Sequence, residues 1–316
     1  MPSALLTSSA GGHLSELVRL SKRMVDVDRF VWAVPDNDQS RSLLGSSRSD
    51  WVIEPIPPLG SRALVGAARL GPVAGRLIER ERPSLVLSTG AAPAVPFLLQ
   101  AARRNLPAYY VESLARLAGP SLSGRILARV PRVRLRTQHD SLDWPGWRSV
   151  GLGLGHYRRE AASPSGPMKV VVTVGTTTFD FRRLFVRLAG VLPSDAQVTW
   201  QTGHSDVDGL DLPGARALVP AAELHAAMAE ADVVVAHAGV GSAFDALDAG
   251  RLPILVPRRS GHGEHVDDHQ AEVARWLTER DLAITAEAED LDGSVLSLAA
   301  HARVSQAGPP EPLVLD

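Results

Sequence analysis

The sequence predicts an α/β protein built from two doubly wound domains that face a common cleft. Short apolar runs alternate with segments of helical period along the whole chain, a pattern typical of parallel sheets covered by helices. At 316 residues the chain exceeds the usual size of one domain. A stretch rich in Ser, Pro and Gly, "REAASPSGPMK" at 159–169, separates the two series as a linker. We therefore expect an N-terminal domain over residues 1–160 and a C-terminal domain over residues 168–316.

The first series begins on a strand and alternates regularly. Helices are expected in "GGHLSELVRLSKRM" (11–24) and "SRALVGAARLGPVAGRLIERE" (61–81), because their apolar residues recur at helical spacing. The strands are expected at 3–8, 30–34, 51–55, 84–88, 107–111 and 132–136.

The second series repeats the alternation after the linker. We expect strands at 169–174, 197–202, 215–219, 232–237 and 252–257. Helices are expected near 179–190, 221–230, 241–249 and 266–280. Ligands of open α/β sheets bind beyond the carboxyl ends of the strands, so the loops that follow these strands are the candidate sites.

Composition excludes several classes of function. The net charge is −2, so no overall field indicates a nucleic-acid partner. The chain has no cysteine, which excludes disulfides, a thiolate nucleophile and cysteine metal sites. No apolar stretch approaches the roughly 20 residues that span a bilayer. We expect a cytoplasmic protein whose membrane contact is peripheral.

Positive charge is concentrated in the first half. No acidic residue interrupts the arginines between Ser113 and His139, and the helix expected at 61–81 adds others. A basic face with apolar neighbours suits an anionic membrane surface or a phosphate-bearing acceptor, and an ordinary solvated helix face is the alternative. The arginines are Arg62, Arg69, Arg76, Arg116, Arg125, Arg129, Arg132, Arg134 and Arg136.

The first strand ends in a glycine turn that carries a histidine. In "LLTSSAGGHLSELVRL", Gly11 and Gly12 permit close approach of a ligand, and the following helix presents free N–H groups to an anion. His13 titrates near neutrality, so it could act in proton transfer. A tight connection with the histidine as a cap is the alternative.

Two loops of the second half have the composition of phosphate-binding loops. "VTVGTTTFD" (172–180) ends a strand in Gly175, followed by the hydroxyl groups of Thr176 and its neighbours. "VVVAHAGVGSAFDALDAG" (233–250) passes from a strand through a glycine turn into a helix, which directs N–H groups and a helix dipole at one point. The glycine spacing does not match a dinucleotide fingerprint. Asp245 is expected in the first turn of that helix, where it could bind ribose hydroxyls.

A third loop, "RRSGHGEHVDDHQ" (258–270), collects imidazoles and carboxylates. His265 and His269 are four residues apart on an expected helix start, a spacing that could bind zinc. No third ligand has a defined spacing, so hydrogen bonds within the loop or to sugar hydroxyls are the preferred interpretation. The polar residues are His262, Glu264, His265, Asp267, Asp268, His269 and Gln270.

Taken together, these loops resemble glycosyltransferase family 28, which includes the MurG relatives and the catalytic subunit of the eukaryotic enzyme that adds the second GlcNAc to dolichol-linked oligosaccharide. The second half carries this likeness in "VTVGTTTFD", "QTGHS", "AHAGVGSAFDALDAGRLPILVPRR" and "GEHVDDHQ". The first half resembles that enzyme's membrane-recruiting subunit through "SSAGGHLSEL", "LVLSTGAAPAVPF" and "YYVESLARL". The chain is thus similar to a fusion of the two subunits, or of a bacterial exopolysaccharide pair of the PssD and PssE type, over 1–135 and 168–281.

The resemblance implies a GT-B fold of two Rossmann-like domains and a role for each loop. His13 corresponds to a residue near the acceptor and is the first candidate base, Gly11 and Gly12 form the acceptor loop, and Glu112 is a second candidate base. Asp245 stands where the family usually has a ribose-binding Glu. The implied donor-binding residues are Gly175, Thr176, His237, Gly239, Gly241, Ser242, Asp245, His269 and Gln270.

The expected function is therefore an inverting, metal-independent hexosyltransferase. It would move a sugar from a UDP-sugar to a polyprenyl-diphosphate-linked saccharide at the inner face of the cell membrane, with no resident cofactor and no nucleic-acid partner. Two alternatives stay open: a UDP-sugar 2-epimerase, which shares the two-domain architecture, and a sugar-nucleotide-binding or recruiting protein without catalysis.

Overall fold

The computed structural model describes residues 2–45, 50–59, 64–139, 143–151, 153–154, 156–266 and 268–315. Arg62 and Asp267, named above, lie outside these ranges. The chain forms two compact units, one made of Met1–Gly153 with Pro310–Asp316 and the other of Leu154–Pro309. Each unit is an α/β domain with its own parallel sheet.

Unit 1 contains a seven-stranded parallel sheet in the order β3-β2-β1-β4-β5-β6-β7. The order reverses next to β1, which places the loops after β1 and β4 beside each other at the carboxyl edge. The strands are β1 (Ser3–Ser8), β2 (Arg29–Pro35), β3 (Trp51–Ile56), β4 (Leu85–Gly90), β5 (Ala108–Val111), β6 (Val133–Thr137) and β7 (Trp147–Ser149).

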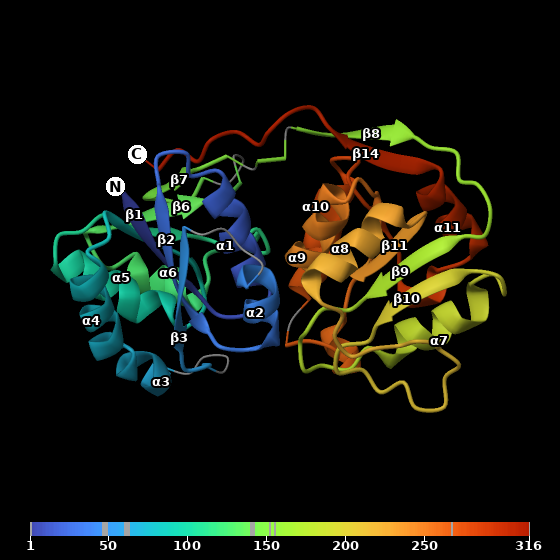
Figure 1. Ribbon diagram of the computed structural model, residues 1–316, viewed down its shortest axis with the longest axis horizontal. Helices are drawn as coiled ribbons and strands as arrows, with labels where there is room; N and C mark the ends of the chain where they lie inside the picture. The colour runs from blue at the N-terminus through green and yellow to red at the C-terminus, as the bar shows by residue number, and fades with distance from the viewer. Residues whose placement is uncertain are drawn as a thin grey trace. The chain divides into compact units, whose positions relative to one another are not determined.

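Helices cover both faces of this sheet (Figure 1). One core joins β1, β2 and β4 to α1, and the other packs the opposite face against α4 and α5. Pro72 lies at the start of α4, so the single helix expected over 61–81 is divided at Leu70. The helices are α1 (Gly12–Lys22), α2 (Asp38–Leu44), α3 (Leu64–Arg69), α4 (Gly71–Glu81), α5 (Ala94–Arg103) and α6 (Leu122–Leu127).

Unit 2 has a five-stranded parallel sheet in the order β10-β9-β11-β12-β13. Helices α8 and α9 pack on one face, and α7 and α11 pack on the other. The strands are β9 (Lys169–Thr173), β10 (Gln197–Gln201), β11 (Val233–His237), β12 (Pro253–Val256) and β13 (Ile284–Thr285). The helices are α7 (Arg182–Val191), α8 (Ala221–Glu230), α9 (Val240–Asp248), α10 (His269–Thr278) and α11 (Gly293–Ala300), with 3₁₀ turns at Ser260–His262 and Ala288–Asp290.

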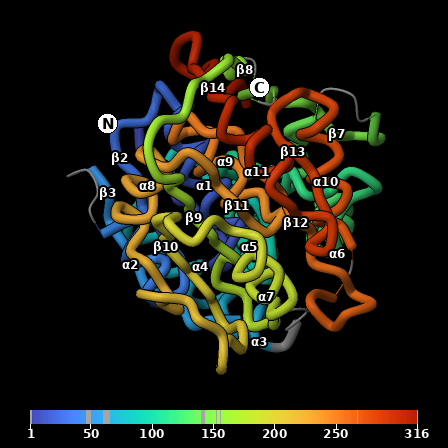
Figure 2. The backbone as a smooth tube through the Cα atoms, turned by 90° about the vertical axis from the view of Figure 1, so that its right-hand side faces the viewer, coloured from blue at the N-terminus to red at the C-terminus, as the bar shows by residue number. Residues whose placement is uncertain are grey.

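The segment expected to be a linker is partly a strand. β8 (Tyr157–Ala161) pairs antiparallel with β14 (Ala302–Gln306), and the red β14 lies beside the green β8 in both views (Figure 1, Figure 2). Most of β8 is charged and exposed, so it lacks the apolar pattern by which a strand is recognised. The division between the units therefore falls at 153/154 rather than within 159–169.

The last described residues return to unit 1. The buried guanidinium of Arg23 donates to the carbonyl oxygens of Glu311, Val150 and Gly151, and the Leu313 N–H donates to Arg23 O at 2.7 Å. Leu313 and Leu315 pack against the core beneath α1. Residues 310–315 are thus structurally part of the first domain, although the sequence places them in the second.

One expected strand does not form among the described residues. Residues 215–219 make only an isolated bridge between Gln201 and Arg216. The backbone pairing reaches no further than Ala217, and Val219 N donates to the side-chain Oε1 of Gln201 at 2.9 Å. Within the ranges that the structure describes, no helix is both long enough and apolar enough to cross a membrane.

Candidate functional site

Two loops of unit 2 meet over the imidazole of His237 at the carboxyl ends of β9 and β11. A Cβ atom added to Gly239 would lie 2.2 Å from His237 Nε2, and one added to Gly175 would lie 2.7 Å from Cε1 of the same ring. Gly175 also has a φ of 70°, in the region that favours glycine. No larger residue fits at either position while the ring stays there. The two backbones thereby form a cradle, Gly175, His237 and Gly239, which we call the glycine cradle.

His237 is a neutral imidazole in this cradle. Burial, and after it the positive charge of Arg258, lowers its pKa to about 3. Its Nδ1 atom is buried without a hydrogen-bond partner in the structure. A ring that stays uncharged at neutral pH can exchange a hydrogen bond with a ligand without a change of charge.

Helix α9 begins directly at the cradle. Gly239 is its N-cap in an extended conformation, and Gly239 O accepts from Ala243 N at 3.1 Å. The helix therefore starts at Val240, earlier than Ser242, and its first-turn N–H groups and dipole favour an anion. Gly241 lies in this first turn. Asp245 falls in the second turn rather than the first, so no acidic residue opposes an anion there.

The histidine-rich loop packs on the same side of unit 2. Helix α10 begins at His269, so His265 precedes the helix and the expected spacing along one helix is wrong. The two rings are nevertheless 4.7 Å apart. Gln270 is 3% exposed, and its Oε1 accepts from Arg258 N at 3.1 Å. This hydrogen bond joins the two ends of the 258–270 loop. In the described part of the chain, no group of three His, Cys, Asp or Glu residues could hold a metal ion.

His13 of unit 1 is oriented by the carboxyl end of β4. Its Nδ1 lies 2.9 Å from Thr89 O, and Thr89 Oγ1 donates back to His13 O at 2.7 Å. A carbonyl oxygen only accepts, so Nδ1 carries the proton of the neutral ring and Nε2 is its unprotonated nitrogen. Gly11 caps the helix at a φ of 84°, and its N–H donates to Gln39. The structure thus brings Gly11, Gly12 and His13 together.

Glu112, the second candidate base, is a buried carboxylate directly after β5. It is 1% exposed, and its carboxylate accepts from Tyr110 OH at 3.1 Å, Ser113 N at 3.3 Å and Ser121 N at 2.9 Å. Burial raises its pKa. These contacts hold the 113–121 loop at the start of α6, so they favour a structural role for this side chain.

Glu16 is a buried carboxyl group that sequence reasoning missed. Its oxygens accept from Ser113 Oγ at 2.6 Å, Leu114 N at 3.1 Å and Gln138 Nε2 at 2.9 Å. Burial raises its pKa from the ordinary 4.5 to about 7, although these three hydrogen bonds oppose the rise. A signal was present, because Glu16 lies between Leu14 and Leu17 on the α1 face that packs on the sheet.

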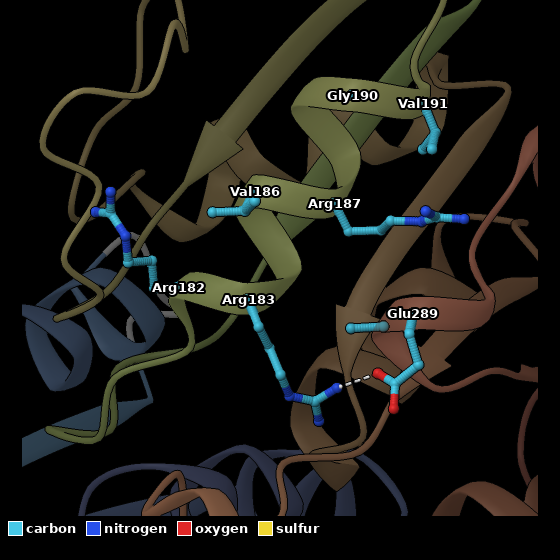
Figure 3. Close-up of a pocket in the computed structure, with 8 residues that line it drawn as sticks. Arg182, Arg183, Val186, Arg187, Gly190, Val191 and Glu289 are labelled. Carbon is cyan, nitrogen blue, oxygen red and sulfur yellow. Dashed lines mark hydrogen bonds and ion pairs between the residues drawn. The ribbon is translucent and has the colours of Figure 1, made fainter.

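An open groove is lined by α7 and by the 3₁₀ turn at Ala288–Asp290. Arg182, Arg183 and Arg187 extend from this helix, and Figure 3 shows Arg183 directed at Glu289 across the groove. Each guanidinium is already engaged: Arg182 with Asp206 O, Arg183 with Glu289 at 3.0 Å and Arg187 with Leu291 O. We therefore do not assign a ligand to this groove.

The basic segment of unit 1 is only partly a surface. Arg125, Arg129 and Arg132 are exposed, next to Leu122, which is 42% exposed. Arg136, in contrast, is 5% exposed and donates to Leu315 O, so it does not belong to this face.

Comparison with known proteins gives concordant matches. The model of the glycosyltransferase family 28 C-terminal domain matches residues 169–309. A curated protein of Ralstonia nicotianae, named UDP-N-acetylglucosamine--N-acetylmuramyl-(pentapeptide) pyrophosphoryl-undecaprenol N-acetylglucosamine transferase, is 28% identical over 66% of this chain and 60% of its own length. The chain spans 60% to 65% of the first curated relatives that it matches.

Solved structures agree on the fold. MurG of Acinetobacter baumannii superimposes with a TM-score of 0.57 at 16% identity, covering 94% of this chain and 88% of its own. The glycosyltransferase SnogD of Streptomyces nogalater gives 0.59 at 19% identity, covering 95% and 90%. At these identities the likeness shows the fold, which is GT-B with two Rossmann-like domains.

Proposed function

We propose, from the match of residues 169–309 to the glycosyltransferase family 28 C-terminal domain, that the chain transfers a hexose from a UDP-sugar to a lipid-linked saccharide. The observation that carries the proposal is the glycine cradle at the start of α9. Two backbone turns without side chains and a helix N-terminus converge there, an arrangement that suits a diphosphate.

The donor would bind with its diphosphate against the cradle. First-turn N–H groups of α9, including that of Ser242, and the Gly175–Thr176 turn would donate to the phosphate oxygens, while the neutral His237 ring adds a further hydrogen bond. These donors are fixed before the reaction, so they stabilise the charge that develops as UDP leaves. Asp245 and His269 remain the proposed contacts to donor hydroxyl groups.

The transfer itself would be a single displacement with inversion. An acceptor hydroxyl oxygen forms a bond to the anomeric carbon while the bond from that carbon to the diphosphate oxygen breaks. The hydroxyl proton passes to Nε2 of His13, and the bonding pair leaves with UDP. The hydrogen bond between Nδ1 and Thr89 O fixes the tautomer for this step and stabilises the imidazolium that forms.

The names of the relatives and the arginines of unit 1 support the proposed class of acceptor. The Ralstonia nicotianae protein is named for an undecaprenyl-pyrophosphoryl acceptor, and we propose a polyprenyl-diphosphate-linked saccharide here. The face made by Arg125, Arg129, Arg132 and Leu122, which we call the basic face, would contact the anionic inner surface of the cell membrane.

A substitution in the cradle tests the donor site. Gly239→Ala is expected to weaken UDP binding by at least about 10-fold, because the new Cβ displaces the His237 ring, whose Cε1 and Nε2 atoms also lie against Gly175. Gly239 has a φ of −79°, so the backbone itself tolerates alanine. Gly190→Ala is the matched control, since Gly190 lies in α7 with no atom within 4 Å of the added Cβ.

Transfer is then measured with labelled UDP-GlcNAc and undecaprenyl-diphosphate-linked saccharides. Product that requires the acceptor supports the proposal. Conversion of UDP-GlcNAc without acceptor would indicate an epimerase, and UDP binding without any transfer would indicate a non-catalytic protein. Equal UDP affinity in the Gly239 and Gly190 variants would contradict the placement of the diphosphate.

A further inference from the structure

Arg258 is a fully buried arginine directly behind the glycine cradle. It follows β12 and is 0% exposed. Nη2 donates to Val174 O at 3.1 Å, and Nη1 donates to Phe179 O at 2.9 Å and to Asp180 O at 2.8 Å. One guanidinium therefore holds both ends of the 174–180 loop, which includes Gly175 and Thr176.

Within the described ranges, the charge of Arg258 has no carboxylate in direct contact, although the charges of Glu264 and Asp180 act on it from a distance. No carboxylate among the described residues forms an ion pair with it, and its Nε atom is buried without a hydrogen-bond partner. The guanidinium lies over the Phe181 ring, 4.8 Å from the centroid, which adds only a weak stabilisation. Burial lowers its pKa to about 10, so the group remains charged at neutral pH. A buried cation of this kind is costly unless an anion compensates it.

The charge acts at the cradle itself. Arg258 is, after burial, the largest influence that lowers the pKa of His237, so its field reaches the ring beneath Gly175 and Gly239. Its backbone N–H is held by Gln270 at the start of α10. Arg183 and Glu264, 2.7 Å apart, pack around the segment that follows, where Glu264 also accepts from Arg259 N at 3.0 Å. The position of this cation is therefore set by contacts from three loops.

We propose that Arg258 is a positioning residue for the donor diphosphate: it fixes both ends of the 174–180 loop and holds a permanent positive charge behind it. The inference rests on the proposed donor site. In this arrangement the diphosphate adds negative charge near a buried guanidinium that no carboxylate of the described chain contacts directly, and the guanidinium acts through the loop without contacting the ligand. The ligand class that it selects is a nucleoside diphosphate rather than a nucleoside.

The experiment compares UDP with uridine on the full chain. Dissociation constants are measured by calorimetry for UDP and by ligand-observed NMR for uridine, with Arg258→Gln and Arg258→Lys. Arg251→Gln is the matched control, because Arg251 lies just before the same strand, at its opposite end, and also donates to backbone carbonyls, those of Met228 and Ala229. Circular dichroism melts report the folding of each variant.

Arg258→Gln is expected to weaken UDP binding by about 10- to 100-fold while uridine changes less than about 2-fold. Arg258→Lys keeps the charge but cannot reach both ends of the loop, so it should recover part of the lost UDP affinity. Arg251→Gln should leave both ligands unchanged. This selectivity for the diphosphate is a readout that a merely structural role would not produce.

Several results would overturn the inference. These are equal losses of UDP and uridine affinity, unchanged UDP affinity in the glutamine variant, or no recovery with lysine. If the glutamine variant does not fold, the lysine variant decides: a loss confined to UDP supports the inference, and any other result contradicts it. If the unaltered chain fails to prefer UDP over uridine, the proposed donor site itself is wrong, which is a distinguishable outcome.

Discussion

Glu16→Gln should change how the stability of unit 1 depends on pH. The carboxyl group is 2% exposed, and burial raises its pKa from 4.5 to about 7. Below pH 4.5, the ordinary pKa that the group has in the unfolded state, both states bind the proton, so the free energy of unfolding does not depend on this group there. Between pH 4.5 and about pH 7 only the folded state keeps the proton, so the free energy of unfolding falls as pH rises. The folded state therefore carries a penalty of about 3 kcal/mol above pH 7.

The glutamine variant lacks this penalty. Its free energy of unfolding, relative to that of the unaltered protein, should increase by about 2.5 kcal/mol between pH 5 and pH 8, whatever constant cost the lost hydrogen bonds add. Glu112 is buried nearby and its pKa is also raised, but it is present in both proteins and largely cancels. The sign is unusual for a carboxyl group, because most acidic side chains stabilise the folded state as pH rises.

Amide hydrogen exchange in β1 and β5 measures this effect for unit 1 alone. The ratio of protection factors, variant over unaltered protein, should rise about 70-fold between pH 5 and pH 8. Glu79→Gln is the control, since Glu79 lies in the same unit with a side chain that is 65% exposed. A ratio that stays flat would show that Glu16 is ionised in the folded protein throughout this range, and the reasoning from burial would be refuted.

Three further predictions concern the proposed activity. His13→Ala should lower kcat by about 10²- to 10⁴-fold at nearly constant donor KM, whereas Asp245→Ala should raise donor KM with little change in kcat; steady-state kinetics with a lipid acceptor would contradict the roles if the pattern were reversed. Gln in place of Arg125, Arg129 and Arg132 should weaken binding to anionic vesicles by about 1 kcal/mol per charge, as measured by sedimentation. Unchanged binding at moderate salt would contradict the proposed role of the basic face in membrane binding. Transfer should persist in EDTA, because backbone groups and a helix N-terminus stabilise the leaving diphosphate; rescue by added manganese or zinc would show otherwise.

The alternation of apolar runs and helical segments was sufficient to predict most of the fold. Buried strands such as β9 and β11 are continuous apolar runs in the sequence, and the glycines of the turns that follow them, Gly175 and Gly239, can be recognised there as well. β8 was not predicted because its charged, exposed residues show no alternation of apolar and polar side chains. Residues 215–219 were wrongly predicted to be a strand because apolar content alone does not ensure that a segment pairs with a neighbouring strand.

The site was predictable where chemistry follows from the backbone. A glycine next to a strand end indicates that another group approaches the backbone closely, and in the glycine cradle the His237 ring does so at Gly175 and Gly239. What could not be predicted depends on contacts between distant segments. Arg258 reads as one of two adjacent arginines after a strand, and only the fold shows that it is buried and reaches Val174, 84 residues earlier. Glu16 likewise becomes a high-pKa carboxyl only when the fold buries it, next to the distant residues Leu114 and Gln138.

The return of residues 310–315 to unit 1 makes the second domain an insertion within the first. A cut at 153/154 would therefore not release two independent proteins, because the second fragment would keep the segment whose Glu311 carbonyl oxygen and Leu313 N–H satisfy Arg23. The first fragment, left alone, would expose the apolar surface that Leu313 and Leu315 cover and leave buried donors of Arg23 and Arg136 with fewer acceptors. The two fragments would behave as a complementing pair, in which a short peptide extension supplies the specificity of reassembly.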